Sequence, residues 1–112
     1  MTDIIIKNTV DLKEIKRLAV RGYRWHSRSN GNTYHSVVVS ALVDNAWVRL
    51  GSSHGDYGYE RQYEVTAVSV LKECVIGWNP KEKSLHYIAD ELGLELENDV
   101  FDVSTKREMI NV

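Results

Sequence analysis

Four histidines and one cysteine are the residues of this 112-residue chain that most readily support catalysis or metal binding. Cys74 stands among apolar residues, and thiols in such surroundings are usually inert. His26 and His35 flank Asn30-Gly31, which favours a two-residue type I′ turn. Such a turn opposes the two imidazoles directly across a hairpin.

Two opposed imidazoles could hold zinc, with His54 or Asp56 as a third ligand. The sequence has no recognisable zinc spacing, no glycine-rich phosphate loop and no metalloprotease motif. Serines beside histidines, such as Ser27 beside His26, point to opposite faces of a strand and cannot form a nucleophile–base pair. We therefore predict a non-enzymatic protein with no catalytic residue, no metal and no cofactor. A metal-dependent hydrolase is the weaker alternative.

The most unusual stretch runs from Asp56 to Tyr63, where three tyrosines alternate with glycine and charged residues at the expected entry to a helix. Tyr57 and Tyr59 could sandwich a planar ring, with Arg61 contacting a phosphate. The alternative is a packed loop whose tyrosines close the edge of the core. The predicted binding residues of this loop are Tyr57, Tyr59, Arg61 and Tyr63.

These residues must be positioned by a sheet, because two turns predict a three-stranded antiparallel meander. The Asn-Gly turn sets the first hairpin, with the two histidines paired. A second turn at Asp44-Asn45 pairs Ala41 with Val48 and Val39 with Leu50. The strands are expected at about 17–28, 33–43 and 46–52.

The two registers give the meander two different faces. One is apolar at every second position and should lie under a helix; it collects Leu18, Val20, Val37, Val39, Ala41, Val43, Ala46, Val48 and Leu50. The other mixes rings with arginines, which suits a base-stacking platform, a dimer interface or burial under a second helix. Its predicted binding residues are Tyr23, Trp25, Tyr34, Trp47, Arg21 and Arg49.

Two helices are expected beside this sheet. Asn79-Pro80-Lys81-Glu82 resembles a capped helix start, and Gly93 favours the end of that helix. A helix over 59–73 is predicted despite its β-branched residues, because the segment has no internal turn signal. One helical turn should follow Asp11, and short edge strands are expected at 4–6 and 100–103. The predicted fold class is α+β: a twisted antiparallel meander with two helices, one on the apolar sheet face, in a single domain over 1–112.

Charge is unevenly distributed although the net charge is only -2. The segment 13–28 is strongly basic, and the segment 82–102 is strongly acidic. The two can pair within one molecule or across a dimer, or the basic half can attract a polyanion. A nucleotide or nucleic-acid binder is the alternative function. It would use Arg21, Arg24, Arg28 and Arg49.

Several segments together resemble a loose group of small phage- and prophage-encoded proteins, mostly uncharacterised. The resemblance covers about residues 15–73 and rests on Trp25-His26, the run 31–37 (Gly-Asn-Thr-Tyr-His-Ser-Val), Tyr57-Gly58-Tyr59 and Gln62-Tyr63. It implies a mobile-element accessory protein that antagonises host defence, either by inhibiting a defence complex, as anti-CRISPR proteins do, or by sequestering a nucleotide signal. It supplies no catalytic residue.

The remaining expectations concern context. No apolar run approaches the ~20 residues that span a bilayer, and no secretory signal is evident. We expect a protein of the host cell cytoplasm with no membrane partner. Its predicted partners are a host protein complex or a small nucleotide, with nucleic acid as a further option, and we expect a homodimer.

Overall fold

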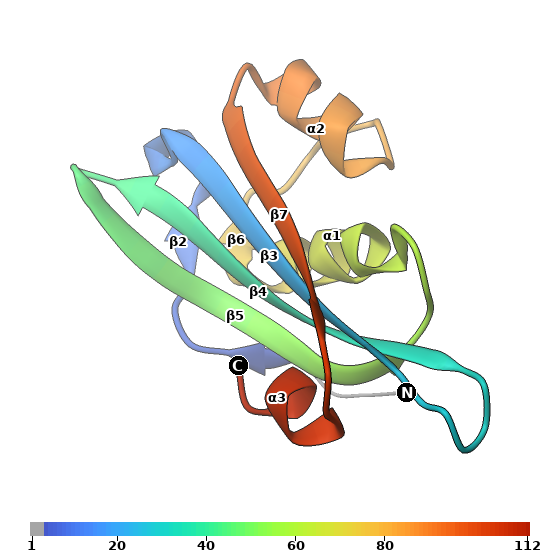
Figure 1. The fold of residues 1–112 in the computed structure, drawn as a ribbon. Helices are drawn as coiled ribbons and strands as arrows, with labels where there is room; N and C mark the ends of the chain where they lie inside the picture. The colour runs from blue at the N-terminus through green and yellow to red at the C-terminus, as the bar shows by residue number, and fades with distance from the viewer. Residues whose placement is uncertain (1–3) are drawn as a thin grey trace.

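The computed structural model describes residues 4–112 and has a five-stranded sheet in the order β1-β5-β4-β3-β7 (Figure 1). Strand β7 runs parallel to β3, and every other neighbouring pair in this sheet is antiparallel. The strands are β1 (Ile5–Ile6), β3 (Arg17–His26), β4 (Thr33–Val43), β5 (Ala46–Tyr57) and β7 (Glu95–Val103). A separate parallel pair joins β2 (Val10–Asp11) to β6 (Val75–Ile76).

The helices are α1 (Gln62–Cys74), α2 (Leu85–Leu92) and α3 (Lys106–Ile110), with a 3-10 turn at Leu12–Glu14. The predicted α+β fold class with a central meander is confirmed. Helix α1 packs on the apolar sheet face, and α2 packs beside α1 and β7. Because α1 buries Val68 and Val70 together with Ala67, Leu71 and Cys74, tertiary packing outweighs the low helix propensity of its β-branched residues. Asp11 caps the expected turn through its side chain.

The predicted register of the first hairpin was wrong by two residues. His26 is paired with Thr33, and His35 is paired with Arg24. Residues 28–31 form a four-residue loop, closed by a bond from the Gly31 amide to the Ser27 carbonyl, so the two-residue turn does not form and the first strand ends at 26. A shift of two residues leaves every side chain on its predicted face, which is why the apolar face was identified correctly.

The second turn forms as expected, with positive φ at both Asp44 and Asn45. Ala41 pairs with Val48 as predicted, but Val39 pairs with Gly51 instead of Leu50. A register shift between Val39 and Ser40 places one extra residue in β5, and a second lies between His35 and Val37. These irregularities carry β5 on to Tyr57, five residues beyond its predicted end.

The predicted start of the second helix was wrong, although its end at Gly93 in the left-handed conformation was right. The amides of Lys81 and Glu82 donate to the Glu91 carboxylate, at 2.9 to 3.0 Å, instead of entering a helix. These bonds lower the pKa of the Glu91 carboxyl. Ser84 therefore precedes the first helical turn, and α1 likewise begins three residues later than expected.

Four elements were missed or underestimated. The edge strand expected at 100–103 is the nine-residue β7, and the short strands β2 and β6 and the helix α3 were not predicted at all. Figure 1 places α1 and α3 on different sides of the sheet. The ring-bearing face is not covered by the second predicted helix, because α2 packs beside α1 and β7. Instead, the five-residue α3 covers one end of this face through Met109, whose sulfur accepts a hydrogen bond from the Ser36 hydroxyl.

The basic and acidic segments pair within one molecule, because β3 and β7 lie side by side. Arg17 lies 2.9 Å from Glu95 and 3.7 Å from Glu97. Arg24 binds Asp102 through two nitrogens, at 2.8 and 3.1 Å. Two of the six cations of the basic segment are therefore paired with acidic residues of β7 in the same molecule.

Among residues 4–112, no helix has both the length and the apolar character needed to cross a bilayer.

Candidate functional site

The sheet face opposite α1, here called the open face, carries rings from four strands. Tyr23 stacks on Phe101 with ring centres 5.5 Å apart, and Trp25 stacks on Tyr34 at 5.9 Å. Tyr57 meets Tyr34 edge-on, also at 5.9 Å. The structure therefore brings the predicted Tyr23, Trp25 and Tyr34 to one face and adds two rings that were not assigned to it.

These rings are unevenly exposed. Phe101 and Trp47 expose nearly half of their surface, and Tyr57 exposes 62%. Tyr23, Trp25 and Tyr34 are half-buried, and Trp25 and Tyr34 line a hollow beside α3. Aromatic clusters of this kind on a solvent-facing sheet are typical of recognition surfaces.

A groove of about 440 Å³ crosses the open face where α3 does not cover it. Its floor is made of small side chains from the two central strands, Ala19, Val38 and Ser40. Trp47 and Arg49 line one side, and Arg21 and Tyr23 line the other; Glu97 and Val112 complete the wall. The size is within the range of small-molecule sites.

Two of the side chains that line this groove are cationic, Arg21 and Arg49, and one is anionic, Glu97. Arg21 is exposed, and Arg49 is half-buried with its Nη2 donating to the Val112 carbonyl oxygen at 3.0 Å. Glu97 opposes them, but Arg17 lies 3.7 Å away from its carboxylate. The groove thus favours a ligand that carries negative charge.

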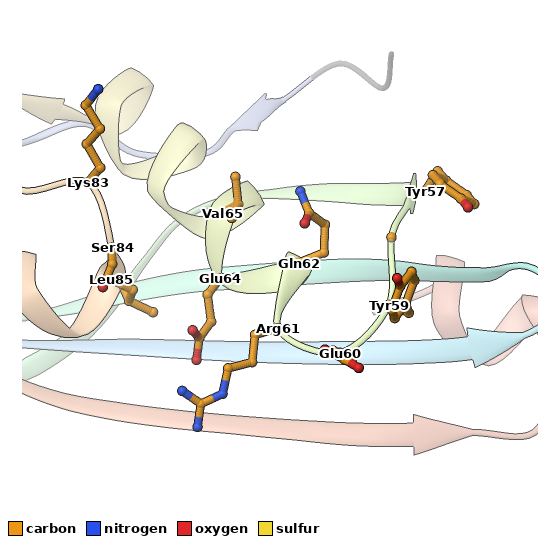
Figure 2. Close-up of a pocket in the computed structure, with 11 residues that line it drawn as sticks. Tyr57, Tyr59, Glu60, Arg61, Gln62, Glu64, Val65, Lys83, Ser84 and Leu85 are labelled. Carbon is orange, nitrogen blue, oxygen red and sulfur yellow. The ribbon is translucent and has the colours of Figure 1, made fainter.

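The tyrosine loop contributes to a second groove, of about 600 Å³. In Figure 2, Tyr57 and Tyr59 lie at one end, and Lys83 and Leu85 lie at the other. Two cations, Arg61 and Lys83, stand against Glu60 and Glu64 among the lining residues, so this groove has no preference for either sign of charge. Tyr59 and Arg61 are exposed, as a binding loop requires.

Tyr63, the last predicted residue of this loop, lies in the core at 4% exposure. Its ring covers Gly22, where a Cβ atom would lie 2.7 Å from the ring's Cγ. Its hydroxyl donates to Asn98 at 3.0 Å. Burial, followed by the nearby Glu64 carboxylate, raises the pKa of the Tyr63 phenol. Tyr63 thus fixes α1 to the sheet and is not available to a ligand.

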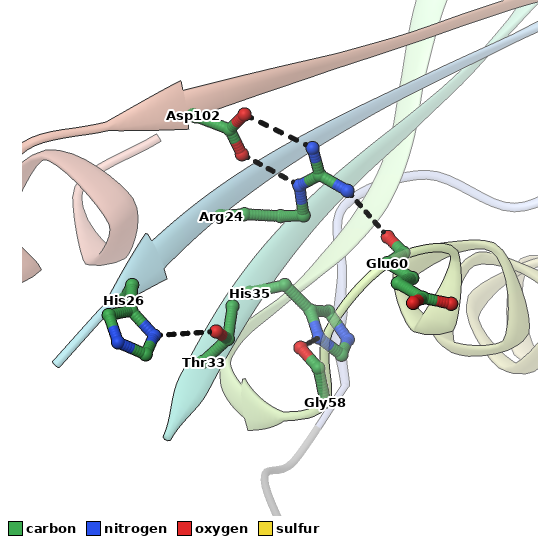
Figure 3. A network of polar contacts seen from close by, with 7 residues as sticks. All are labelled: Arg24, His26, Thr33, His35, Gly58, Glu60 and Asp102. Carbon is green, nitrogen blue, oxygen red and sulfur yellow. Dashed lines mark hydrogen bonds and ion pairs between the residues drawn. The ribbon is translucent and has the colours of Figure 1, made fainter. Parts of the chain in front are cut away.

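Several residues of the sequence pattern, among them His26, Thr33, His35 and Gly58, lie close together where β3 and β4 meet the β5–α1 connection (Figure 3). His35 is fully buried; its Nδ1 lies 3.1 Å from the Gly58 carbonyl oxygen and its Nε2 lies 2.7 Å from the Thr66 hydroxyl. A carbonyl oxygen only accepts, so Nδ1 carries the proton and Nε2 accepts from Thr66. These contacts tie β4 to the loop and the first turns of α1.

Gly58 is required at this junction, because its φ of +148° is a conformation that side chains rarely adopt. A Cβ atom there would also collide with Gln62. Arg24 completes the junction by donating to the Glu60 carbonyl oxygen at 2.9 Å (Figure 3). His35 and Gly58 thus have structural roles in the β5–α1 connection, which places Tyr57 and Tyr59 at the surface.

Both ring nitrogens of His35 are engaged, which removes the predicted histidine pair as a zinc site. His26 instead contacts the Thr33 hydroxyl at 3.0 Å. Burial lowers the pKa of His35, against the opposing influence of the Gly58 carbonyl and Asp56. Within residues 4–112, no three potential metal ligands of the His, Cys, Asp and Glu types come together.

Cys74 is fully buried, as its apolar neighbours predicted. Burial raises the pKa of its thiol, followed in effect by the Glu73 carboxylate. Thiol chemistry at neutral pH is therefore disfavoured at this position.

Sequence reasoning missed Phe101 and Glu97 as parts of the open face. The signal was present: Leu94, Leu96 and Val100 alternate with acidic residues, which predicts a strand whose odd-numbered residues, Glu97 and Phe101 among them, face away from the core. The acidic character of the segment masked that alternation. Tyr57 was identified as a binding residue but was assigned to the loop alone.

Comparisons with protein-family models, curated proteins and solved structures find no significant match to this chain.

Proposed function

We propose that this chain is a non-enzymatic binding protein of phage or mobile-element origin, and that it antagonises a host defence by holding a small ligand on its open face. Its place of action is the cytoplasm of the host cell. The origin rests on the sequence resemblance, and the binding role rests on the geometry of the face.

The groove of the open face is the observation that carries this proposal. An antiparallel sheet that only faces water needs polar outward side chains. Here Trp47 is 46% exposed beside a groove of about 440 Å³ that also contains two arginines. A ligand with a flat apolar part and an anionic part would satisfy both features at once.

Charge compensation argues against a long nucleic acid as the target. Arg17 and Arg24, which lie in the most basic segment, are paired with Glu95, Glu97 and Asp102 on β7. Exposed Asp99 adds further negative charge along that edge of the sheet. A polyanion following the face would meet this acidic strand, so a compact ligand is favoured.

The proposal is tested by plating phage on hosts that each carry one defence system and express the protein. At least one defence should be relieved by the wild-type chain and by a control with Lys72→Gln and Tyr87→Ala, two exposed residues outside the groove. A groove variant with Trp47→Ala and Arg21→Gln should restore defence. Equal relief by the groove variant would contradict the proposal.

Docking on a host protein complex is the second candidate, favoured by the exposure of Phe101 and Tyr57 outside the groove. A protein target would cover these rings too, so Phe101→Ala and Tyr57→Ala should weaken relief as strongly as Trp47→Ala. If the target is a small ligand, only the groove variants should weaken the relief of host defence. Light scattering of the same variants measures whether the expected homodimer forms and whether it uses this face.

A further inference from the structure

We propose that the open-face groove binds a nucleotide bearing a single phosphate group, with the base on Trp47 and the phosphate between Arg49 and Arg21. This assignment rests on the proposed function, because it names the class of ligand held by the same groove. The argument uses the positions of three side chains and one opposing carboxylate.

Trp47 supplies the platform for the base. It stands two residues before Arg49 on β5, so both side chains leave the same face about 7 Å apart. The indole is 46% exposed, and Trp47 forms none of the aromatic pairs found among residues 4–112. Its ring is therefore free to stack with a planar ligand, and stacking on aromatic side chains accepts any base.

The two arginines supply the phosphate site. Arg49 lies in a cross-strand row with Ser40 and Ala19, and Arg21 lies in the next row on β3. Strand spacing puts their Cα atoms about 12 Å apart across the small side chains of the floor. That separation lets two long side chains reach one anion from opposite sides, and the guanidinium group suits phosphate oxygens. Ser40 adds a hydroxyl group to the groove between them.

Glu97 limits how much negative charge the groove accepts. It lies in the same row as Arg49, on the far side of Ala19 and Ser40, and its side chain is half exposed. A chain of phosphates extending past the arginines would approach this carboxylate and the neighbouring Asp99. One phosphate is therefore preferred over three, in contrast to a typical triphosphate site.

The test is a titration of the full chain with 5′-AMP, in which binding is measured by calorimetry and by the shift of the NMR signal of the Trp47 indole N–H. GMP, UMP and 3′,5′-cyclic AMP probe base and phosphate type. Adenosine contains the base without the phosphate, inorganic phosphate contains the phosphate without the base, and ATP carries two additional phosphates. We expect 5′-AMP to bind at least about tenfold more tightly than either half, and more tightly than ATP.

Four variants make the assignment specific. Trp47→Ala should weaken 5′-AMP binding about tenfold, and Trp47→Phe should recover part of the loss. Arg21→Gln should weaken the binding of 5′-AMP and leave the binding of adenosine unchanged. Glu97→Gln should increase the affinity for ATP more than the affinity for 5′-AMP, so the difference between the two affinities should become smaller. The control with Lys72→Gln and Tyr87→Ala should bind as the wild type does, and circular dichroism verifies that each variant is folded.

The proposal is overturned if none of the mononucleotides binds at millimolar concentration, or if the shifted NMR signals map to the groove between Tyr57 and Leu85. It is also overturned if Glu97→Gln leaves the preference between 5′-AMP and ATP unchanged. Failure here is distinguishable from failure of the proposed function. If the groove variants restore host defence but the wild-type chain binds no nucleotide, the nucleotide assignment fails, and the proposed function stands with another small ligand in the groove. Nucleotide binding with no effect in the plating assay would remove the counter-defence role instead.

Discussion

Replacing Thr66 by valine tests whether the buried His35 junction holds the β5–α1 connection. The substitution keeps the shape of the side chain and its helix propensity but removes the hydroxyl that lies 2.7 Å from His35 Nε2. Because His35 has no exposed surface, its Nε2 loses its only partner in a place that water does not reach. Leaving such a group unsatisfied costs about 1–3 kcal/mol, and we expect the free energy of unfolding to fall by that amount.

The measurement is urea unfolding at pH 7.5, with Thr66→Ser as the matched control. Serine keeps the hydroxyl, so it should retain most of the stability that valine loses. His35→Asn is a second variant, because a short amide can still donate to the Gly58 carbonyl. If Thr66→Val stays within about 0.5 kcal/mol of the wild type, the His35 junction does not stabilise the fold as argued.

The same junction has a defined pH dependence. The pKa of His35 is lowered by burial, so the folded protein resists a proton that the unfolded chain accepts near pH 6.5. Stability should therefore be complete above about pH 6.5 and should fall as the pH drops below it, by at most about 1.4 kcal/mol per pH unit. His35→Asn removes this contribution. A wild-type slope between pH 6.5 and 5 equal to that of His35→Asn would refute the assignment.

Three further predictions follow from packing. Gly22→Ala should lower the free energy of unfolding by about 1–3 kcal/mol, because the new methyl group displaces the Tyr63 ring; unchanged urea midpoints would contradict that contact. Cys74 should react with a disulfide reagent only as fast as the protein unfolds, since its thiol is buried with a raised pKa, and rapid reaction of the native protein would show that the site is open. Met109→Ala should speed amide hydrogen exchange in residues 106–110 with little change elsewhere, because that side chain fastens a five-residue helix to Ser36; unchanged exchange would mean that other contacts hold α3.

The elements whose identity depends on local pattern were predictable. Alternation of apolar residues identified the covered sheet face, and Gly93 marked the end of α2. The turn at Asp44-Asn45 followed from residue types that tolerate positive φ.

The features that depend on distant partners were not predictable. The first hairpin takes a four-residue loop, although Asn30-Gly31 favours a two-residue turn. The segment before α2 is held by the Glu91 carboxylate, ten residues away in sequence from Lys81. Neither the loop length nor that long-range bond is encoded in a local pattern.

The candidate site was predicted only in part, because some of its features follow from local pattern and others depend on distant partners. Period-two alternation placed Tyr23, Trp25, Tyr34 and Trp47 on one face without knowledge of the exact register. The groove itself also needs Glu97 from β7, a strand that joins the sheet by pairing in parallel with β3 after about 70 intervening residues. The role of the tyrosine loop in the core was hidden because it depends on Gly22 and His35, which meet it only in the folded chain.

The most direct test of ligand binding on the open face is a capture experiment with small-molecule extracts of phage-infected host cells. Three immobilised proteins are loaded in parallel: the wild-type chain, the Trp47→Ala and Arg21→Gln groove variant, and the Lys72→Gln and Tyr87→Ala control. The released compounds are identified by mass spectrometry. We predict a compound that is enriched on the wild type and the control and absent from the groove variant. The same compounds in the same amounts on all three proteins would contradict the claim that this face holds the ligand.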